Sequence, residues 1–179
     1  MNRYKLFKEW YFNEEGRRIS LNNSLNIPIG LLTILFAIIF YLITEYNYTI
    51  SGIVLKIVFI IFLSMSILTC FISIFFLIKA YNNIFKGFEY NGLPYAQKLN
   101  GYYSELRKFY LIDHENEEKV NIDNKFEEYL TNELAEYIDN NVYNNDKKSE
   151  YLFKSKKCII IGVLLIILTF IPYAINSYF

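Results

Sequence analysis

Three long stretches of the sequence carry almost no charge, and they limit what this chain can fold into. They cover residues 27–44, 53–78 and 158–175, and Lys56 is the one charged side chain within them. A helix needs about 20 apolar residues to cross the hydrocarbon core of a bilayer, because each residue advances it by about 1.5 Å. Among 179 residues, three buried core helices of this length would leave too little polar chain to cover them. The sequence therefore predicts an all-α integral membrane protein with three transmembrane helices.

The rest of the sequence falls between and around these spans. Only 20% of the residues are charged, and most of them lie outside the three stretches. We expect five regions: a cytoplasmic amphipathic tail (1–26), a transmembrane hairpin (27–78, with spans 27–44 and 53–78), a small helical cytoplasmic cap (79–157), a third transmembrane helix (158–175) and an external tail (176–179).

The positions of lysine and arginine predict the orientation of the chain. Five of them lie in the N-terminal tail and twelve in residues 79–157, whereas residues 45–52 and 176–179 have none. Positive charge near span ends favours the cytoplasmic side. We therefore expect a multi-pass protein of the cell inner (plasma) membrane with a cytoplasmic N-terminus and an external C-terminus. The formal net charge is zero, so nucleic acid is not an expected partner.

Several side chains suit the boundary between bilayer and water. Lys56 can extend back to the outer headgroups, and Trp10 can anchor the N-terminal tail at the inner interface. The tail (RYKLFKEWYF) fits either a short interfacial helix or a segment packed on the cap. Lys154, Lys156 and Lys157 precede the third span, where they can contact anionic lipid or, alternatively, a nucleotide or RNA.

Apolar spacing predicts two helices in the cap. The first follows Pro94 and extends to Ile112, and the second covers residues 126–142. Residues 113–124 are acidic and rich in asparagine, which favours a solvated loop over a divalent-ion site. We expect the run Asn144-Asn145-Asp146 to break the chain before a helix that leads into the third span.

Hydroxyl side chains form a stripe on the second span. Ser66, Thr69 and Ser73 fall within about 60° of one another on a helix of 3.6 residues per turn. Such a stripe either contacts a neighbouring helix or lines a water-filled path. Cys70 and Cys158 lie in apolar surroundings and are expected to be packing residues. The sequence predicts no cofactor and no metal site.

One pair of residues resembles a catalytic motif. Arg107 and His114 are separated by six residues, and this spacing resembles the motif of HEPN ribonucleases, which are all-α proteins. The resemblance implies that Arg107 and His114 of two subunits would cleave RNA without a metal. Lys108 departs from the polar residue usual after the arginine in that family. The alternative is an exposed histidine in an acidic loop.

The short hairpin of residues 27–78, followed by Lys79-Ala-Tyr-Asn-Asn-Ile-Phe-Lys86 and a helical cap, resembles the SLATT-type small membrane effectors of bacterial conflict systems. It is also similar to the small membrane accessory proteins of type VI CRISPR loci. The third span departs from the simplest form of the former.

Both resemblances imply an oligomeric membrane effector that perturbs or permeabilises the bacterial inner membrane in antiphage defence, without enzymatic activity. The expected partners are the lipid bilayer, further copies of the chain, and a soluble sensor or nucleotide second messenger. Two alternatives remain: a membrane-anchoring adaptor for a soluble partner, with Tyr81, Phe85, Phe88 and Tyr90 as its patch, and a membrane-bound HEPN-like ribonuclease.

Overall fold

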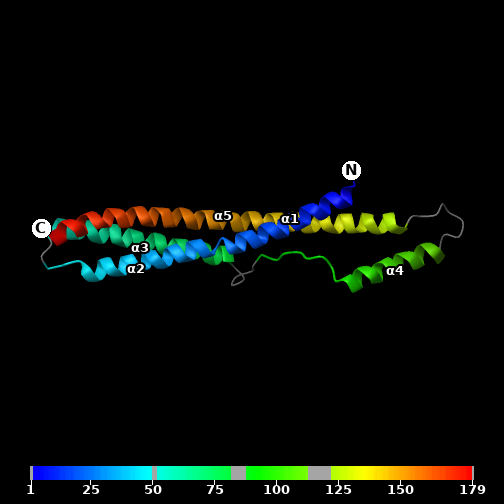
Figure 1. The fold of residues 1–179 in the computed structure, drawn as a ribbon, viewed down its shortest axis with the longest axis horizontal. Helices are drawn as coiled ribbons and strands as arrows, with labels where there is room; N and C mark the ends of the chain where they lie inside the picture. The colour runs from blue at the N-terminus through cyan, green and yellow to red at the C-terminus, as the bar shows by residue number, and fades with distance from the viewer. Residues whose placement is uncertain (1, 50–51, 82–87, 113–121, 179) are drawn as a thin grey trace. The chain divides into compact units, whose positions relative to one another are not determined.

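The computed structural model describes residues 2–49, 52–81, 88–112 and 122–178, and these ranges contain helices and no strand (Figure 1). Three helical stretches are long and apolar enough to cross a membrane: residues 3–45, 53–81 and 122–177. The predicted all-α class and the three candidate spans are therefore confirmed. The helices are α1 (Arg3–Asn23), α2 (Asn26–Glu45), α3 (Ile53–Tyr81), α4 (Ala96–Ile112) and α5 (Ile122–Tyr178).

The chain forms two compact units. The polar unit consists of Met1–Ile19 and Phe88–Asn145, and the apolar unit consists of Ser20–Gly87 and Asp146–Phe179. The first part of the N-terminal tail thus belongs with the cap residues, whereas the lysine-rich residues 146–157 belong with the spans. Two of the three unit boundaries fall inside a helix, one in α1 and one in α5.

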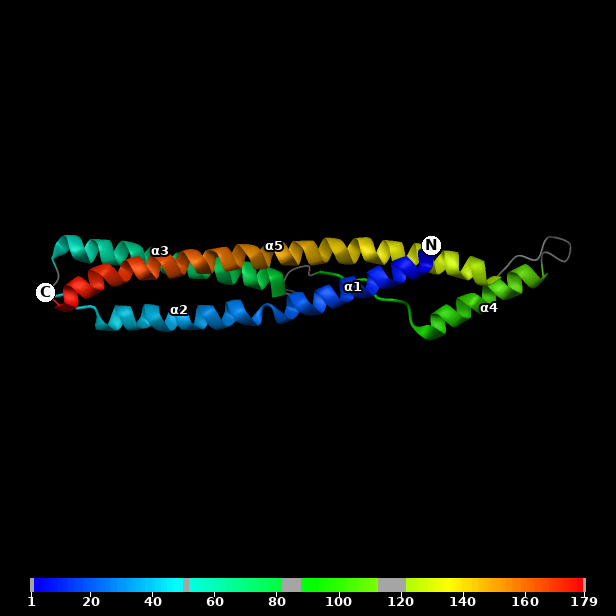
Figure 2. The ribbon, with the colours of Figure 1, turned by 45° about the horizontal axis from the view of Figure 1, so that its top comes forward.

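In the apolar unit, α2, α3 and the C-terminal part of α5 run side by side (Figures 1 and 2). The α2–α3 connection and the end of α5 lie at the same end of this unit, where Asn176 Nδ2 donates a hydrogen bond to the carbonyl oxygen of Asn47 at 3.2 Å. Large apolar side chains such as Phe40 and Ile53 are 69% and 75% exposed on its outer surface. An outer surface of this kind suits lipid rather than water.

The buried residues of α2 and α3 follow a repeat of 3.5 residues. Their positions alternate in steps of three and four, as in a coiled coil, so each helix presents one narrow buried face to its neighbours. On the α2 side they are Leu25, Pro28, Leu32, Leu35, Ile39, Leu42 and Tyr46. On α3 they are Phe59, Leu63, Ser66, Cys70, Ser73, Leu77 and Ala80.

Helix α5 keeps the same repeat over most of its length. Its main buried positions are Thr131, Leu134, Ile138, Asn141, Asn145, Lys148, Leu152, Ser155, Ile159, Gly162, Ile166 and Thr169. The expected break at Asn144-Asn145-Asp146 is wrong, because α5 passes through these residues without interruption. Asparagine disrupts a helix when its side chain bonds to its own local backbone. Here Asn144 and Asn145 bond to other segments instead.

The short interruption between α1 and α2 has a local cause. Ser24 and Leu25 form a turn, and Pro28 follows four residues after Ser24. Proline has no backbone N–H, so the carbonyl of Ser24 lacks its helical donor. The backbone of Leu25 stays in the helical region, with φ −70° and ψ −28°. The chain therefore passes from α1 to α2 with only a brief interruption.

The Tyr46 side chain offers a test of the packing in the apolar unit. It is 3% exposed, and its ring stacks on Phe59 with centroids 3.8 Å apart. Within the described residues its hydroxyl has no hydrogen-bond partner. Because burying an unsatisfied hydroxyl is unfavourable, Tyr46→Phe should raise the free energy of unfolding by about 1 kcal/mol. Thermal unfolding of the full chain in detergent would measure this.

Tyr48→Phe is the matched control, since the Tyr48 hydroxyl donates to the Ile43 carbonyl and the residue is 38% exposed. It should give no gain in stability. A lower melting temperature for Tyr46→Phe would contradict the assignment.

Candidate functional site

The hydroxyl stripe of α3 lies against α5. Ser73 Oγ and Ser155 Oγ are 2.8 Å apart, and Ser73 Oγ also donates to the carbonyl oxygen of Ser155 at 3.2 Å. One heptad away, Ser66 Oγ donates to the Gly162 carbonyl at 3.3 Å. Ser66, Ser73 and Ser155 are fully buried. These contacts join the two helices by hydrogen bonds in the part of the chain where water would be scarce.

Gly162 lets α3 and α5 approach closely. A Cβ atom placed on it would lie 3.1 Å from Thr69 Oγ1 and 3.8 Å from Cys70 Sγ. Thr69 donates its own hydroxyl hydrogen to the Ser66 carbonyl at 2.8 Å. The stripe of Ser66, Thr69 and Ser73 therefore faces a neighbouring helix of the same chain. This geometry favours the helix-contact interpretation of the stripe over the pore-lining one.

In the polar unit, asparagines of α5 hold an extended segment of the chain. Asn140 and Asn144 both donate through Nδ2 to the carbonyl oxygen of Glu89, at 2.7 and 2.6 Å. Asn141 pairs with the backbone of Asn91 in both directions: its Oδ1 accepts from the N–H at 3.0 Å and its Nδ2 donates to the carbonyl at 3.1 Å. We call Asn140, Asn141, Asn144 and Asn145 the asparagine clamp. It supplies partners to a segment that forms no helix.

Asn145 extends the clamp to α1. Its Nδ2 donates to the Glu14 carbonyl at 2.9 Å and to Glu14 Oε2 at 2.8 Å, and its Oδ1 accepts from the Tyr90 hydroxyl at 2.9 Å. The Arg18 guanidinium lies 4.1 Å from the centre of the Tyr90 ring. Burial raises the pKa of the Tyr90 hydroxyl above its usual value, and the positive charge of Arg18 opposes that rise. Tyr90 thus remains a hydrogen-bond donor at neutral pH.

Apolar contacts complete the junction of α1 with α5. Tyr11 is 5% exposed and packs with Leu134 and Ile138, and its hydroxyl accepts a hydrogen bond from the Leu93 N–H at 3.3 Å. Tyr4 and Phe7 pack against the same cluster. Of the two interpretations of the N-terminal tail, the structure supports packing on the cap residues. Trp10, which was expected to anchor the tail at the inner interface, is 45% exposed.

The lysines that were expected at the membrane interface differ in how exposed their side chains are. Lys56 is half-buried, whereas Lys156 and Lys157 are exposed. Lys154 Nζ lies 2.6 Å from Glu150 Oε1, which lowers the pKa of the Glu150 carboxyl and raises that of the Lys154 ammonium. Lys148 was not singled out from the sequence. It is 4% exposed, and its ammonium group donates to the Asn22 side-chain oxygen.

Of the two residues that resemble the ribonuclease motif, the structure describes only Arg107. Arg107 is exposed on α4, and His114 lies outside the described residues. Near Arg107, the Tyr103 hydroxyl donates to Asp123 Oδ1 at 2.9 Å, and this bond raises the pKa of Tyr103. The bond fastens α4 to the first turn of α5.

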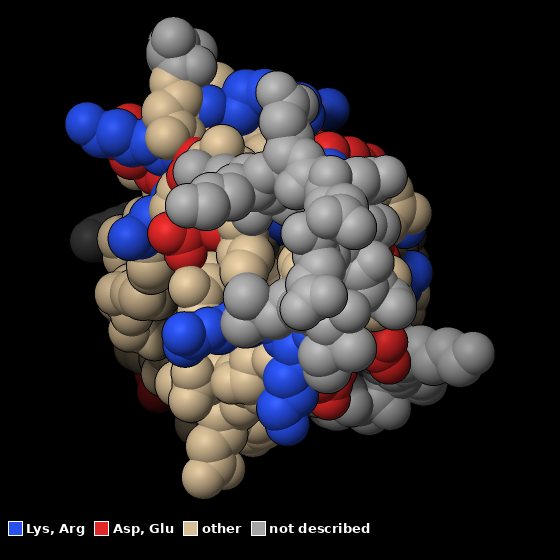
Figure 3. All heavy atoms as spheres, turned by 90° about the vertical axis from the view of Figure 1, so that its right-hand side faces the viewer, with Lys and Arg blue, Asp and Glu red and all other residues tan. Residues whose placement is uncertain are grey.

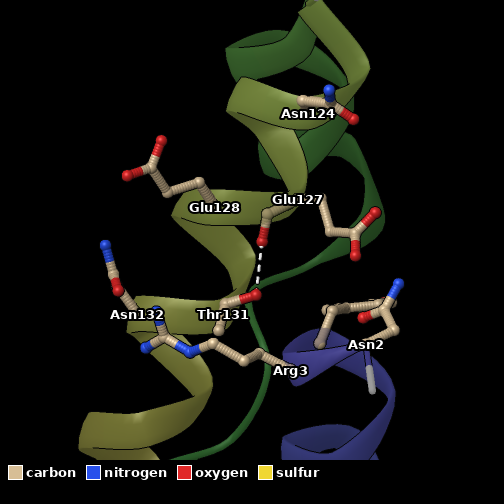
Figure 4. Close-up of a pocket in the computed structure, with 8 residues that line it drawn as sticks. Asn2, Arg3, Asn124, Glu127, Glu128, Thr131 and Asn132 are labelled. Atoms are coloured by element: carbon tan, nitrogen blue, oxygen red, sulfur yellow. Dashed lines mark hydrogen bonds between the residues drawn. The ribbon is translucent and has the colours of Figure 1, made fainter.

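A polar hollow of about 470 Å³ lies between the first turn of α1 and the first turns of α5 (Figure 4). In Figure 4 the Arg3 side chain extends toward the turn of α5 that carries Thr131 and Asn132. Glu127, Glu128 and Asn124 complete the α5 side. Carboxylates, amides and a guanidinium together suit a small polar molecule. Within the described ranges, no three His, Cys, Asp or Glu side chains gather as metal ligands would.

Sequence reasoning missed the asparagine clamp because asparagine runs commonly mark turns. The available signal was their spacing, since Asn141, Asn145 and Lys148 continue the steps of three and four that Leu134 and Ile138 begin. A polar residue inside such a repeat indicates a buried polar contact that sets register.

Close packing at Gly162 predicts a position-specific response to a larger side chain. Gly162→Leu should lower the free energy of unfolding by about 1–3 kcal/mol, because the new side chain would overlap Thr69 and Cys70. Gly30→Leu is the control, since nothing lies within 4 Å of a Cβ atom placed there. Denaturation in mixed micelles would compare the two. Equal effects would refute the close approach.

Loss of the clamp should be visible as local hydrogen exchange. Asn141→Ala removes the acceptor of the Asn91 N–H and the donor to its carbonyl, so amide exchange in residues 88–95 should accelerate about tenfold. Asn132→Ala replaces an exposed asparagine of the same helix and should leave that exchange unchanged. Mass spectrometry of the full chain resolves the segment. Unchanged exchange in Asn141→Ala would show that the clamp does not order it.

Comparisons of the chain with known protein families, with curated proteins and with solved structures found no match.

Proposed function

We propose that the chain is a non-enzymatic effector of the bacterial inner membrane that self-associates and thereby perturbs or permeabilises the bilayer in antiphage defence. The observation that carries this proposal is the composition of the apolar unit. Its buried serines Ser66, Ser73 and Ser155 are hydrogen-bonded between α3 and α5, while its outer surface is apolar on each span. Such a unit is suited to sit in lipid, with these serines enclosed between its own helices.

Perturbation of the membrane by this chain therefore requires several copies. Ser66, Ser73 and Ser155 are fully buried, so they cannot conduct water or ions within one copy. An assembly can instead form a path or a packing defect between copies. The inner surface of the expected assembly would contain side chains that are exposed in the single chain.

Helix α5 would transmit the binding of a trigger molecule at the polar unit to the membrane spans. The asparagine clamp and the apolar residues of the third span belong to one uninterrupted helix. A soluble sensor or a nucleotide messenger that altered the clamp would thus act on the element that also enters the membrane. The polar hollow beside Arg3 and Glu127 is one place for a small polar molecule of this kind.

The adaptor alternative is less well supported. Of its proposed aromatic patch, Tyr90 is engaged by Asn145 and Arg18 within the polar unit, and Phe85 lies outside the described residues. Tyr81 remains 73% exposed. The ribonuclease alternative depends on His114, which also lies outside the described residues.

Dye release from liposomes tests the proposed function. The full chain, reconstituted into vesicles of phosphatidylethanolamine and phosphatidylglycerol, should release an entrapped dye with a steeper than linear dependence on protein density, because several copies must meet. Gly162→Leu should reduce release, since it disturbs the contact between α3 and α5. The Gly30→Leu control should retain it.

Intact vesicles at every protein density, together with a monomeric chain in detergent, would refute the effector proposal. Release that is linear in protein density would refute the requirement for several copies.

A further inference from the structure

The α4–α5 hairpin of the polar unit has an apolar face that its own two helices cover incompletely. Among the described side chains of α4, from Ala96 to Tyr110, none is buried. Five of them are half-buried at helical spacing: Leu99, Tyr102, Tyr103, Leu106 and Tyr110. Ring contacts of Tyr102 with Tyr129 (4.2 Å) and of Tyr103 with Phe126 (5.2 Å) fix the two helices together.

One side of this hairpin carries a groove of about 370 Å³. Tyr102 and Glu105 line it from α4, and Tyr129 lines it from α5. Gly101 also lies in the groove, and nothing occupies the 4 Å around a Cβ atom placed on it. On the same side of α4, one turn beyond Glu105, Phe109 is 55% exposed. The groove is therefore open, partly aromatic and accessible to a close neighbour.

Charge on the two helices is opposite in sign. Helix α4 carries three basic side chains against one acidic, whereas residues 122–145 of α5 carry six acidic side chains against one basic. Lys98 and Lys108 on α4 are exposed, as are Glu136 and Asp139 on α5. In Figure 3, which faces the side of Figure 1 where α4 and the start of α5 lie, basic and acidic side chains are both exposed.

A surface with a basic half and an acidic half is complementary to itself under twofold symmetry. If two copies meet about a twofold axis, α4 of each lies on α5 of the other, and both contacts pair opposite charges. We propose that the α4–α5 hairpin is the surface through which two copies of this chain associate, with the grooves facing each other. This inference deepens the proposed function, on which it rests, by naming the surface of self-association.

The first experiment fills the groove. Gly101→Leu has room in the single chain but occupies the space that the partner needs, so it should weaken dimerisation of the full chain in detergent about tenfold. Gly16→Leu on α1 is the control, because its Cβ position is equally open. Sedimentation equilibrium measures the dimer dissociation constant. An unchanged constant for Gly101→Leu would overturn the proposal.

The second experiment reverses the charges. Lys98→Glu with Lys108→Glu makes both halves acidic, and Glu136→Lys with Asp139→Lys makes α5 less acidic and locally basic. Each double variant alone should dimerise about tenfold more weakly than the original chain, because like charges then face each other. A mixture of the two double variants should restore association as heterodimers, which native mass spectrometry identifies by mass.

The chain that carries all four substitutions separates contacts within one copy from contacts between copies. It restores opposite charges in both places, so it should fold and dimerise. If this chain recovers and the mixture does not, the charges act within one hairpin and the proposal is wrong. Dye release that persists without any charge dependence would leave the effector function standing while refuting this surface. A chain that neither associates nor releases dye would refute both.

Discussion

The structure depends on one continuous buried face along α5. That face repeats every 3.5 residues from Thr131 to Thr169, so a single helix can pack against neighbours through most of its length. Polar groups within it must be hydrogen-bonded, because burial without a partner is costly. Asn141, Asn145 and Ser155 meet this requirement with bonds to the chain segments packed against them. Each polar position thereby fixes which residue lies opposite it.

The polar residues on the buried face of α5 are of different types in the two units. In the polar unit, the amides of the asparagine clamp bind backbone groups of an extended segment that has no ladder of its own. In the apolar unit, small hydroxyls and Gly162 allow α3 to approach closely. The longer asparagine side chains can reach the backbone of an irregular segment that lies beside the helix. Small side chains let two helices pack closely in lipid. One helix therefore serves both purposes with one repeat.

The sequence was sufficient for the helical class and the candidate spans, because runs such as residues 27–44 have few other interpretations. It also predicted α4 from the spacing behind Pro94. It was misleading at Asn144 and Asn145, since local propensity favours a turn there and only partners distant in sequence make the helix stable. The partners of Ser66 and Ser73 were not predictable either, because a hydroxyl stripe on one helix does not identify the surface that it faces.

The account rests on α5 being one helix with one buried face through Asn144 and Asn145, and an accessibility scan tests this directly. Single spin labels placed at each position from 138 to 152 of the full chain in lipid bilayers would report collision with a water-soluble relaxation agent. We predict an unbroken periodicity with minima at Ile138, Asn141, Asn145, Lys148 and Leu152. A jump in phase or a loss of periodicity at residues 144–146 would contradict the account.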